Sequence, residues 1–148
     1  NDGKPTGKHG LHIMLPLGRQ CPYEQSRMLG ELLARCVLRE LSDIATITRH
    51  VTKRGDKVYL DYLQNRHGQT IVAPFSVRPL PGATVSMPLT WGEVNESLDP
   101  RAHTIKTAIE RMERLIADPV APVLEGKPDL ARVLDQLTAL WGNQQRTT

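Results

Sequence analysis

Apolar residues recur at helical spacing in three stretches of the chain, and each stretch predicts an amphipathic helix. The longest runs from Pro22 to about Leu41, and the others run from Thr104 to Ala117 and from Asp129 to Trp141. The apolar positions are Met28, Leu29, Leu32, Leu33, Cys36, Val37 and Leu41 in the first, Ile105, Ala108, Ile109, Met112, Leu115 and Ile116 in the second, and Leu130, Val133, Leu134, Leu137 and Leu140 in the third.

Short β signals surround the first helix. Residues 11–15 predict a strand with Leu11, Ile13 and Leu15 on one face and His12 on the other. Three further signals lie around residues 45–51, 57–63 and 69–73, separated by turns at 54–56 and 66–68. This order, β-α-β-β-β, predicts an α+β fold. We expect a small, mostly antiparallel sheet with helices packed on it and a helical C-terminal region.

The segment between the last β signal and the second helix is rich in proline. Four prolines between residues 74 and 88 favour an irregular crossing over regular structure. Just after it, Thr90-Trp91-Gly92-Glu93 has the spacing of a capping box, in which a threonine cap and a glutamate three residues later open a short helix.

Composition and charge narrow the class of protein. With 148 residues and 39% hydrophobic composition, one globular unit is expected. No apolar run approaches the roughly 20 residues of a membrane helix, and no signal-peptide pattern opens the sequence, so we expect a soluble, cytosolic protein. Cys21 and Cys36 are too few for a disulfide framework or a zinc site.

The net charge of +3 suits phosphate-bearing partners, and the positive charge is concentrated in one place. This basic cluster, a candidate phosphate- or DNA-facing surface centred on Lys53 and Lys57, could equally be a solvated edge strand and turn. Its members are Arg49, His50, Lys53, Arg54 and Lys57.

The loop Thr6-Gly7-Lys8-His9-Gly10 leads directly into the first predicted strand. Glycines allow backbone N–H groups to face an anion, while Lys8 and Thr6 add charge and a donor, so the loop is a candidate phosphate site. It lacks the spacing of a Walker loop, and an ordinary polar turn is the alternative.

Two polar residues lie inside predicted strands, where such residues are uncommon. His12 is either a structural histidine or a donor to a triphosphate. Asp61, within Val58–Leu63, needs a partner if it is buried, either a salt bridge to Lys57 or an arginine, or a metal ion. Magnesium or manganese suits a carboxylate ligand.

Together these features resemble the archaeo-eukaryotic primase superfamily. The sequences of the individual motifs are similar to those of the polymerase domain of bacterial ligase D. The resemblance runs from about Thr6 to Leu115 and covers the C-terminal part of that domain. The motifs that carry it are Thr6-Gly7-Lys8-His9-Gly10-Leu11-His12, Lys57-Val58-Tyr59-Leu60-Asp61-Tyr62-Leu63-Gln64-Asn65, Thr70-Ile71-Val72-Ala73-Pro74-Phe75-Ser76-Val77-Arg78, Pro88-Leu89-Thr90-Trp91 and Leu98-Asp99-Pro100-Arg101 before Thr104-Ile105.

The resemblance implies a role for each matching residue. His12 and Arg78 would contact the incoming triphosphate, Thr6 would lie beside its phosphates, and Asp61 would be the third metal carboxylate. Arg54 and Gln64 match positions near the nucleotide, although strand alternation turns Gln64 away from Asp61 unless the strand ends or bulges there. The family's lysine falls at Lys8 or at His9.

The resemblance also implies a bacterial, nucleoid-associated function. The complete protein would add nucleotides to DNA ends in non-homologous end joining, with a primer 3′-hydroxyl attacking the α-phosphate and with Mn²⁺ or Mg²⁺ as cofactor. Nucleoside triphosphates, DNA ends and ligase or nuclease domains would be its partners. Residues 1–118 would be the C-terminal part of the palm and 119–148 a helical extension.

One family motif is missing from the sequence. A D-x-D pair, which supplies the other two metal carboxylates and precedes the histidine motif in the family, does not occur in the 148 residues. One aspartate cannot hold two cations, so we expect this chain alone not to polymerise. The alternatives are a non-catalytic nucleotide- or DNA-end-binding module of the same fold, or a structural fragment. Uncovered apolar surface would also favour self-association.

Overall fold

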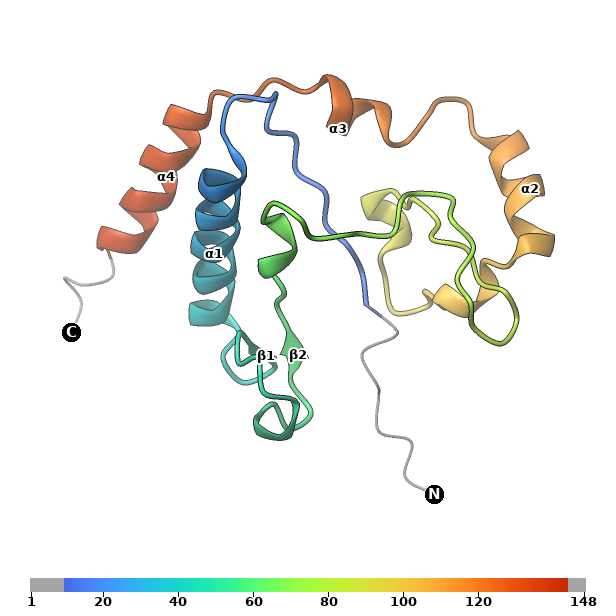
Figure 1. The fold of residues 1–148 in the computed structure, drawn as a ribbon, viewed down its shortest axis with the longest axis horizontal. Coiled ribbons are helices and arrows are strands. Elements are labelled where there is room, and N and C mark those ends of the chain that lie inside the picture. Colours follow the sequence, from blue (N-terminus) through green and yellow to red (C-terminus); the bar gives the residue numbers. More distant parts are fainter. Residues whose placement is uncertain (1–9, 144–148) are drawn as a thin grey trace. The chain divides into compact units, whose positions relative to one another are not determined.

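The computed structural model describes residues 10–143, and the chain divides into two compact units (Figure 1). Within the described residues, the first unit comprises 10–16 and 72–126, and the second comprises 17–71 and 127–143. The mixture of helices with a small sheet confirms the α+β class. None of the helices in the described part of the chain is long and apolar enough to span a membrane. The sequence-based division at residue 118 stays a prediction.

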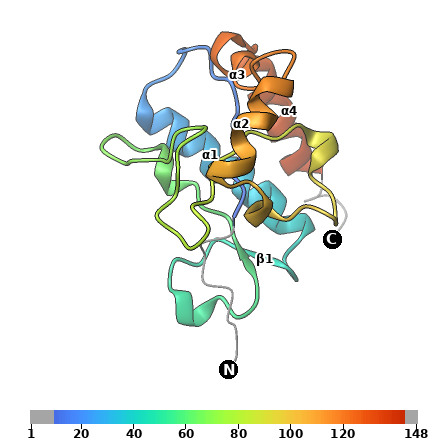
Figure 2. The same ribbon diagram turned by 90° about the vertical axis from the view of Figure 1, so that its right-hand side faces the viewer.

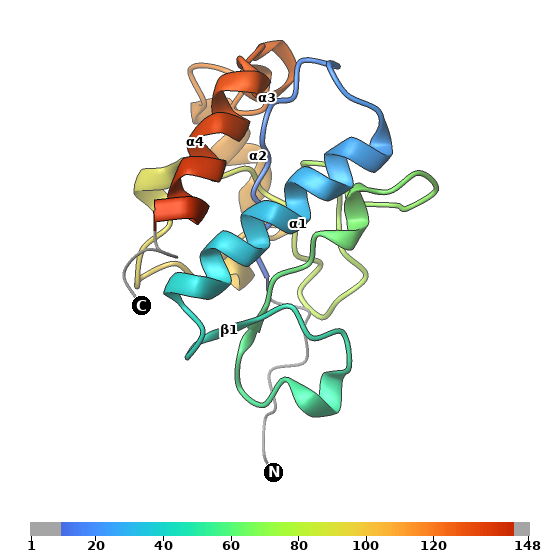
Figure 3. The same cartoon turned by 90° about the vertical axis from the view of Figure 1, so that its left-hand side faces the viewer.

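The second unit is built on helix α1, Tyr23–Glu40, which confirms the longest predicted helix. Pro22, with extended backbone, lies directly before it, where its missing N–H costs no helical hydrogen bond. Helix α4, Leu130–Asn143, lies beside α1 (Figure 3). The Arg39 guanidinium lies 4.5 Å from the centroid of the Trp141 ring and joins the two helices.

The sheet of this unit has two short strands, β1 (Ala45–Thr46) and β2 (Val58–Tyr59), and they run parallel. The expectation of a mostly antiparallel sheet is therefore wrong in this detail. The connection 47–57 is long enough to bring the chain back to the start of β1, and it forms a closed loop with a 3-10 turn at Val51–Lys53 instead of a hairpin. The Val58 N–H donates to the Ile44 carbonyl at 2.8 Å, and the Leu60 N–H donates to that of Thr46 at 2.8 Å.

Two other predicted strands do not form. Residues 11–15 and 69–73 have no strand pairing, and most of their side chains are exposed. Alternation of apolar residues specifies a strand only when a partner edge is available, and none of the described segments offers one to either stretch. The predicted β-α-β-β-β order is thus reduced to α1-β1-β2.

The first unit is an irregular, turn-rich segment packed against a helix. Antiparallel bridges join Val77 to Val85 and Thr84 to Thr104. Thr104 caps helix α2, Ile105–Arg114, in agreement with the predicted helix start. The helix α2 is labelled in Figure 2. Val85 and Ala108 form its buried centre. A short helix α3, Ala121–Glu125, which the sequence pattern did not predict, and 3-10 turns at Leu63–Asn65 in the second unit and at Trp91–Glu93 and Pro100–Ala102 in the first complete the fold.

Candidate functional site

The candidate site residues are divided between the two units. His12 and Arg78 belong to the first unit, and Arg54, Asp61 and Gln64 belong to the second. Thr6, Lys8 and His9 lie outside the described residues, so their predicted phosphate contacts stay predictions.

Asp61 lies just beyond β2 and is exposed, so the expectation of an aspartate inside a strand is wrong. The strand ends at Tyr59, and the Asp61 Oδ1 atom accepts a hydrogen bond of 3.0 Å from the Leu63 N–H at the start of the 3-10 turn Leu63–Asn65. This local bond turns the chain out of the strand. Because the strand ends, alternation no longer separates Gln64 from Asp61. The carboxylate stays accessible to solvent and to a ligand.

The 3-10 turn that follows Asp61 is positioned by packing against α1. The turn Leu63–Asn65 makes the most extensive contact of α1 with another element. Gly30 permits it, because a Cβ at that position would lie 2.9 Å from the Asn65 Nδ2 atom and 3.4 Å from the Tyr62 Cβ atom. Asn65 Nδ2 in turn donates to the Tyr62 carbonyl at 3.0 Å. Gly30, in the middle of α1, therefore leaves room for the segment carrying Asp61 and Gln64 to lie against the helix.

Arg54 has a structural task in the loop between the strands. Its Nε atom donates to the Thr48 carbonyl at 2.9 Å and one Nη atom donates to that of Arg49 at 2.8 Å. Its guanidinium also lies 3.7 Å from the centroid of the Tyr59 ring. These contacts close the loop 47–57 and leave the second Nη atom as the main donor for a ligand.

The two lysines assigned to DNA differ in their contacts. The Lys57 Nζ atom donates to the Ser42 carbonyl at 2.6 Å and fastens the start of β2. The Lys53 side chain, at the end of a 3-10 turn, is exposed and makes no hydrogen bond or ion pair within the described part of the chain. Lys53 is therefore the better candidate for a phosphate contact.

His12 and Arg78 both have uncommitted side chains. His12 is exposed, and neither side chain makes a hydrogen bond or an ion pair within the described residues. The backbone of Arg78 is fixed by two bonds, from its N–H to the Thr84 carbonyl at 2.7 Å and from the Leu80 N–H to its own carbonyl at 2.8 Å. A half-buried arginine on a fixed backbone is a suitable anion ligand.

Glu93 makes several hydrogen bonds and an ion pair in the first unit, although the sequence analysis gave it no functional role. Glu93, in the capping box that the sequence predicted, also forms a two-pronged ion pair with Arg111 of α2. The two N–O distances are 2.6 Å and 3.0 Å, and Arg111 also donates to the Pro88 carbonyl at 3.2 Å. This pair joins the segment 88–93 to α2.

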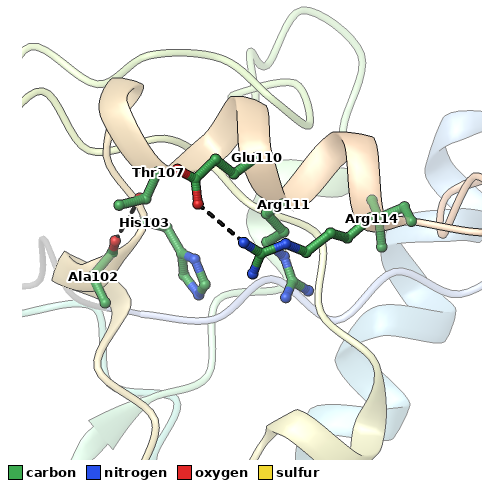
Figure 4. A pocket seen from close by; sticks show the side chains of 7 residues that line it. Ala102, His103, Thr107, Glu110, Arg111 and Arg114 are labelled. Atoms are coloured by element: carbon green, nitrogen blue, oxygen red, sulfur yellow. Dashed lines mark hydrogen bonds and ion pairs between the residues drawn. The ribbon is translucent and has the colours of Figure 1, made fainter.

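The surroundings of this pair alter two pKa values. The Arg111 hydrogen bond, followed by the Thr90 N–H, lowers the pKa of Glu93 to about 2. Burial, followed by the positive charge of Arg111, lowers the pKa of His103 below its usual value. Beside the pair lies a hollow of about 460 Å³ (Figure 4), whose polar lining includes His103, Thr107 and Glu110. Arg111 lies three residues after Ala108 and so close to the helix side that packs into the unit, which was the sequence signal for this pair.

The described residues do not form a metal centre by themselves. Among residues 10–143, no group of three or more histidine, cysteine, aspartate or glutamate side chains lies close enough to hold a metal ion. Asp61 offers one carboxylate, whereas a pair of cations needs several bridging oxygens. A two-metal centre therefore does not fit this set of residues.

Comparison with known proteins identifies the family. The model of the LigD primase-polymerase domain matches residues 3–120. The bifunctional non-homologous end joining protein LigD of Bacillus subtilis is 37% identical over 75% of this chain and 18% of the relative. The multifunctional LigD of Mycolicibacterium smegmatis is 28% identical over 90% of this chain and 17% of the relative. The chain thus spans under a fifth of the length of these relatives.

A solved structure has the same fold. The polymerase domain of Mycobacterium tuberculosis Ligase D in complex with DNA matches with a TM-score of 0.64 and 24% identity, over 72% of this chain and 36% of the solved chain. The resemblance seen in the sequence motifs is confirmed by the family match over most of the chain. The chain belongs to the LigD primase-polymerase domain family.

Proposed function

We propose that this chain supplies the nucleotide-binding part of a LigD-type polymerase that adds nucleotides to DNA ends in non-homologous end joining. His12 and Arg78 hold the triphosphate, and Asp61 is one carboxylate of the catalytic centre. The observation that supports this most directly is the pair of uncommitted side chains, His12 and Arg78, at the motif positions of a matched family.

Catalysis requires more carboxylates than this sequence contains. When bound, two divalent cations, Mn²⁺ or Mg²⁺, would polarise and align the attacking and leaving oxygens. The D-x-D motif is absent from the 148 residues, so the chain by itself acts as a nucleotide-binding module. Its DNA partner is proposed from the basic cluster and from the relative solved with DNA.

The triphosphate site predicts a ligand-dependent rise in melting temperature. A ligand that binds only the folded state stabilises it, so ATP with Mn²⁺ at about ten times Kd should raise Tm by roughly 3–6 °C. His12→Ala or Arg78→Ala should remove most of the rise, as measured by differential scanning fluorimetry. Arg132→Ala, which removes an exposed arginine of α4, is the matched control and should keep the rise. A full rise in both site variants would exclude this site.

DNA binding through Lys53 predicts a salt dependence. Each lysine–phosphate contact releases a counterion, so Lys53→Ala should reduce the slope of log K against log salt by about one. Fluorescence anisotropy with a labelled DNA end measures this slope. Lys57→Ala is less informative because it also removes the bond to Ser42, and Lys127→Ala in the same unit serves as the control. Affinity that does not respond to salt contradicts the proposal.

A further inference from the structure

Helix α2 carries an apolar stripe that faces solvent. Ile105, Ile109 and Met112 recur at positions i, i+4 and i+7 and therefore share one face of the helix, and Ile116 follows just past its end. All four side chains are exposed, Ile109 at 63% and Ile116 at 104%. We call these four residues the α2 apolar stripe.

Two other parts of the helix surface are already in use. Ala108 is 5% exposed and packs into the unit, while Arg111 forms the ion pair with Glu93. Figure 4 shows the polar face, where Glu110 pairs with Arg114 and the Thr107 hydroxyl donates to the Ala102 carbonyl at 2.7 Å. The helix is thus held on one side and solvated on another. The stripe is a third part of the helix surface, and its four side chains are between 46% and 104% exposed.

The described residues cover too little apolar surface for a closed core. Among the described residues, only Ala34, Ala45, Val85 and Ala108 are buried apolar residues, and no side chain is fully buried. A chain that folds alone normally buries several large apolar side chains. The fold therefore needs further polypeptide to cover its exposed apolar side chains.

The comparison with the solved relative indicates which polypeptide this is. The chain aligns with 36% of the polymerase domain of Mycobacterium tuberculosis Ligase D, so most of that fold lies outside the aligned segment. Helix α2 lies inside the stretch matched by the family model. The part of that fold outside the aligned segment is therefore the polypeptide that we expect to contact the exposed surface of α2.

The size of the stripe favours this occupant over a second copy of the chain. Four such side chains offer at most on the order of 500 Å² of apolar area. A stable interface between separate proteins buries roughly 800 Å² on each partner. A strip of this size is typical of one helix face within a larger domain interior.

We infer that the α2 apolar stripe is the docking face for the remaining part of the primase-polymerase domain fold. The inference rests on the fold and on the exposure of four side chains, and not on polymerase activity. It is therefore tested by association, so that failure to bind nucleotide leaves it unaffected.

The test measures binding of this chain to the part of the Bacillus subtilis LigD primase-polymerase domain that lies outside the segment matched by this chain. Biolayer interferometry gives Kd, and light scattering gives the mass of the chain alone. The double variant Ile109→Asn and Met112→Asn should weaken binding on the order of 100-fold, because two apolar side chains lose their burial. It should leave the Tm of the chain alone nearly unchanged, since both side chains are exposed there.

The matched control places the same two asparagines on exposed polar positions of the same helix, as Lys106→Asn and Glu113→Asn, and should bind as the original chain does. Equal Kd for the stripe and control variants overturns the inference, as does a complete lack of binding. A dimer of the chain alone that only the stripe variant dissociates also overturns it, because the occupant is then a second copy.

A second measurement removes the dependence on a separately produced partner. In a protein that joins both parts through a Gly/Ser linker, a thiol introduced as Ile109→Cys should be protected from maleimide at least tenfold relative to the chain alone. Mass spectrometry of the peptide that contains position 109 separates it from Cys21 and Cys36. Equal labelling in both proteins contradicts the inference.

Discussion

Purified residues 1–148 should add no nucleotide to a DNA primer in Mn²⁺, and a longer protein that also carries the D-x-D segment of a ligase D polymerase domain should extend it. The reason is the number of carboxylates, because positioning two cations against the reacting oxygens requires ligands that this sequence does not contain. Gel analysis of a labelled primer measures both outcomes. Extension by the chain alone that survives Asp61→Ala, in a preparation verified by mass spectrometry, would show that the metal site is wrongly assigned.

In the longer protein, primer extension should depend on the carboxylate of Asp61. Asp61→Ala should lower extension by about 10³-fold or more, since it removes a carboxylate from the reacting centre. Asp61→Asn is the sharper variant, because an amide oxygen can still accept the hydrogen bond from the Leu63 N–H and so preserve the turn. Asp56→Ala, another exposed aspartate of the second unit, is the control. Activity that survives Asp61→Asn and is lost in Asp61→Ala would assign Asp61 a structural role only.

Helices α1 and α2 were predictable because each has both a periodic apolar pattern and a clear start. Pro22 precedes α1 and Thr104 caps α2, so the predicted and observed beginnings agree. The capping box of Thr90 and Glu93 is confirmed for the same reason, since it depends on local hydrogen bonds alone.

The strands were less predictable because their pairing depends on distant residues. The direction of β2 follows from the closed loop 47–57, which the side chain of Arg54 ties to two carbonyls of its own loop. A turn at 54–56 is equally compatible with a hairpin, so the sequence favoured antiparallel strands. Periodicity also could not place Asp61, because β2 ends at Tyr59 and the Asp61 carboxylate accepts a hydrogen bond from the Leu63 N–H in a local turn.

The residues of the candidate site also differ in how far the sequence could predict them. Their positions inside predicted strands singled out His12 and Asp61, whereas motif resemblance alone selected Arg78. Their side chains are exposed or half-buried, with few or no protein partners in the described part of the chain. The Glu93–Arg111 pair was missed because its partners are 18 positions apart and belong to different elements.

Replacing Arg111 should give the largest loss of stability in the first unit. Arg111→Met keeps the length of the side chain and removes both bonds to Glu93 and the bond to the Pro88 carbonyl. The pair is 23% and 35% exposed, so solvent screening reduces its contribution, and we expect a loss of about 1–3 kcal/mol in the free energy of unfolding. Arg114→Met removes an exposed pair on the same helix and should have little effect.

The effect of Arg111→Met should depend on pH in a defined direction. The pKa of Glu93 is about 2 in the folded protein, below the ordinary 4.5, so the unfolded state binds more protons between these values. The contribution of the pair is therefore complete above about pH 4.5 and is lost as pH falls toward 2. Urea unfolding of a Trp141→Phe background, in which Trp91 reports on the first unit, measures the difference between original and variant at pH 7 and pH 3. A difference that is as large at pH 3 as at pH 7 would mean that the Glu93 carboxylate is not the partner that makes Arg111 important.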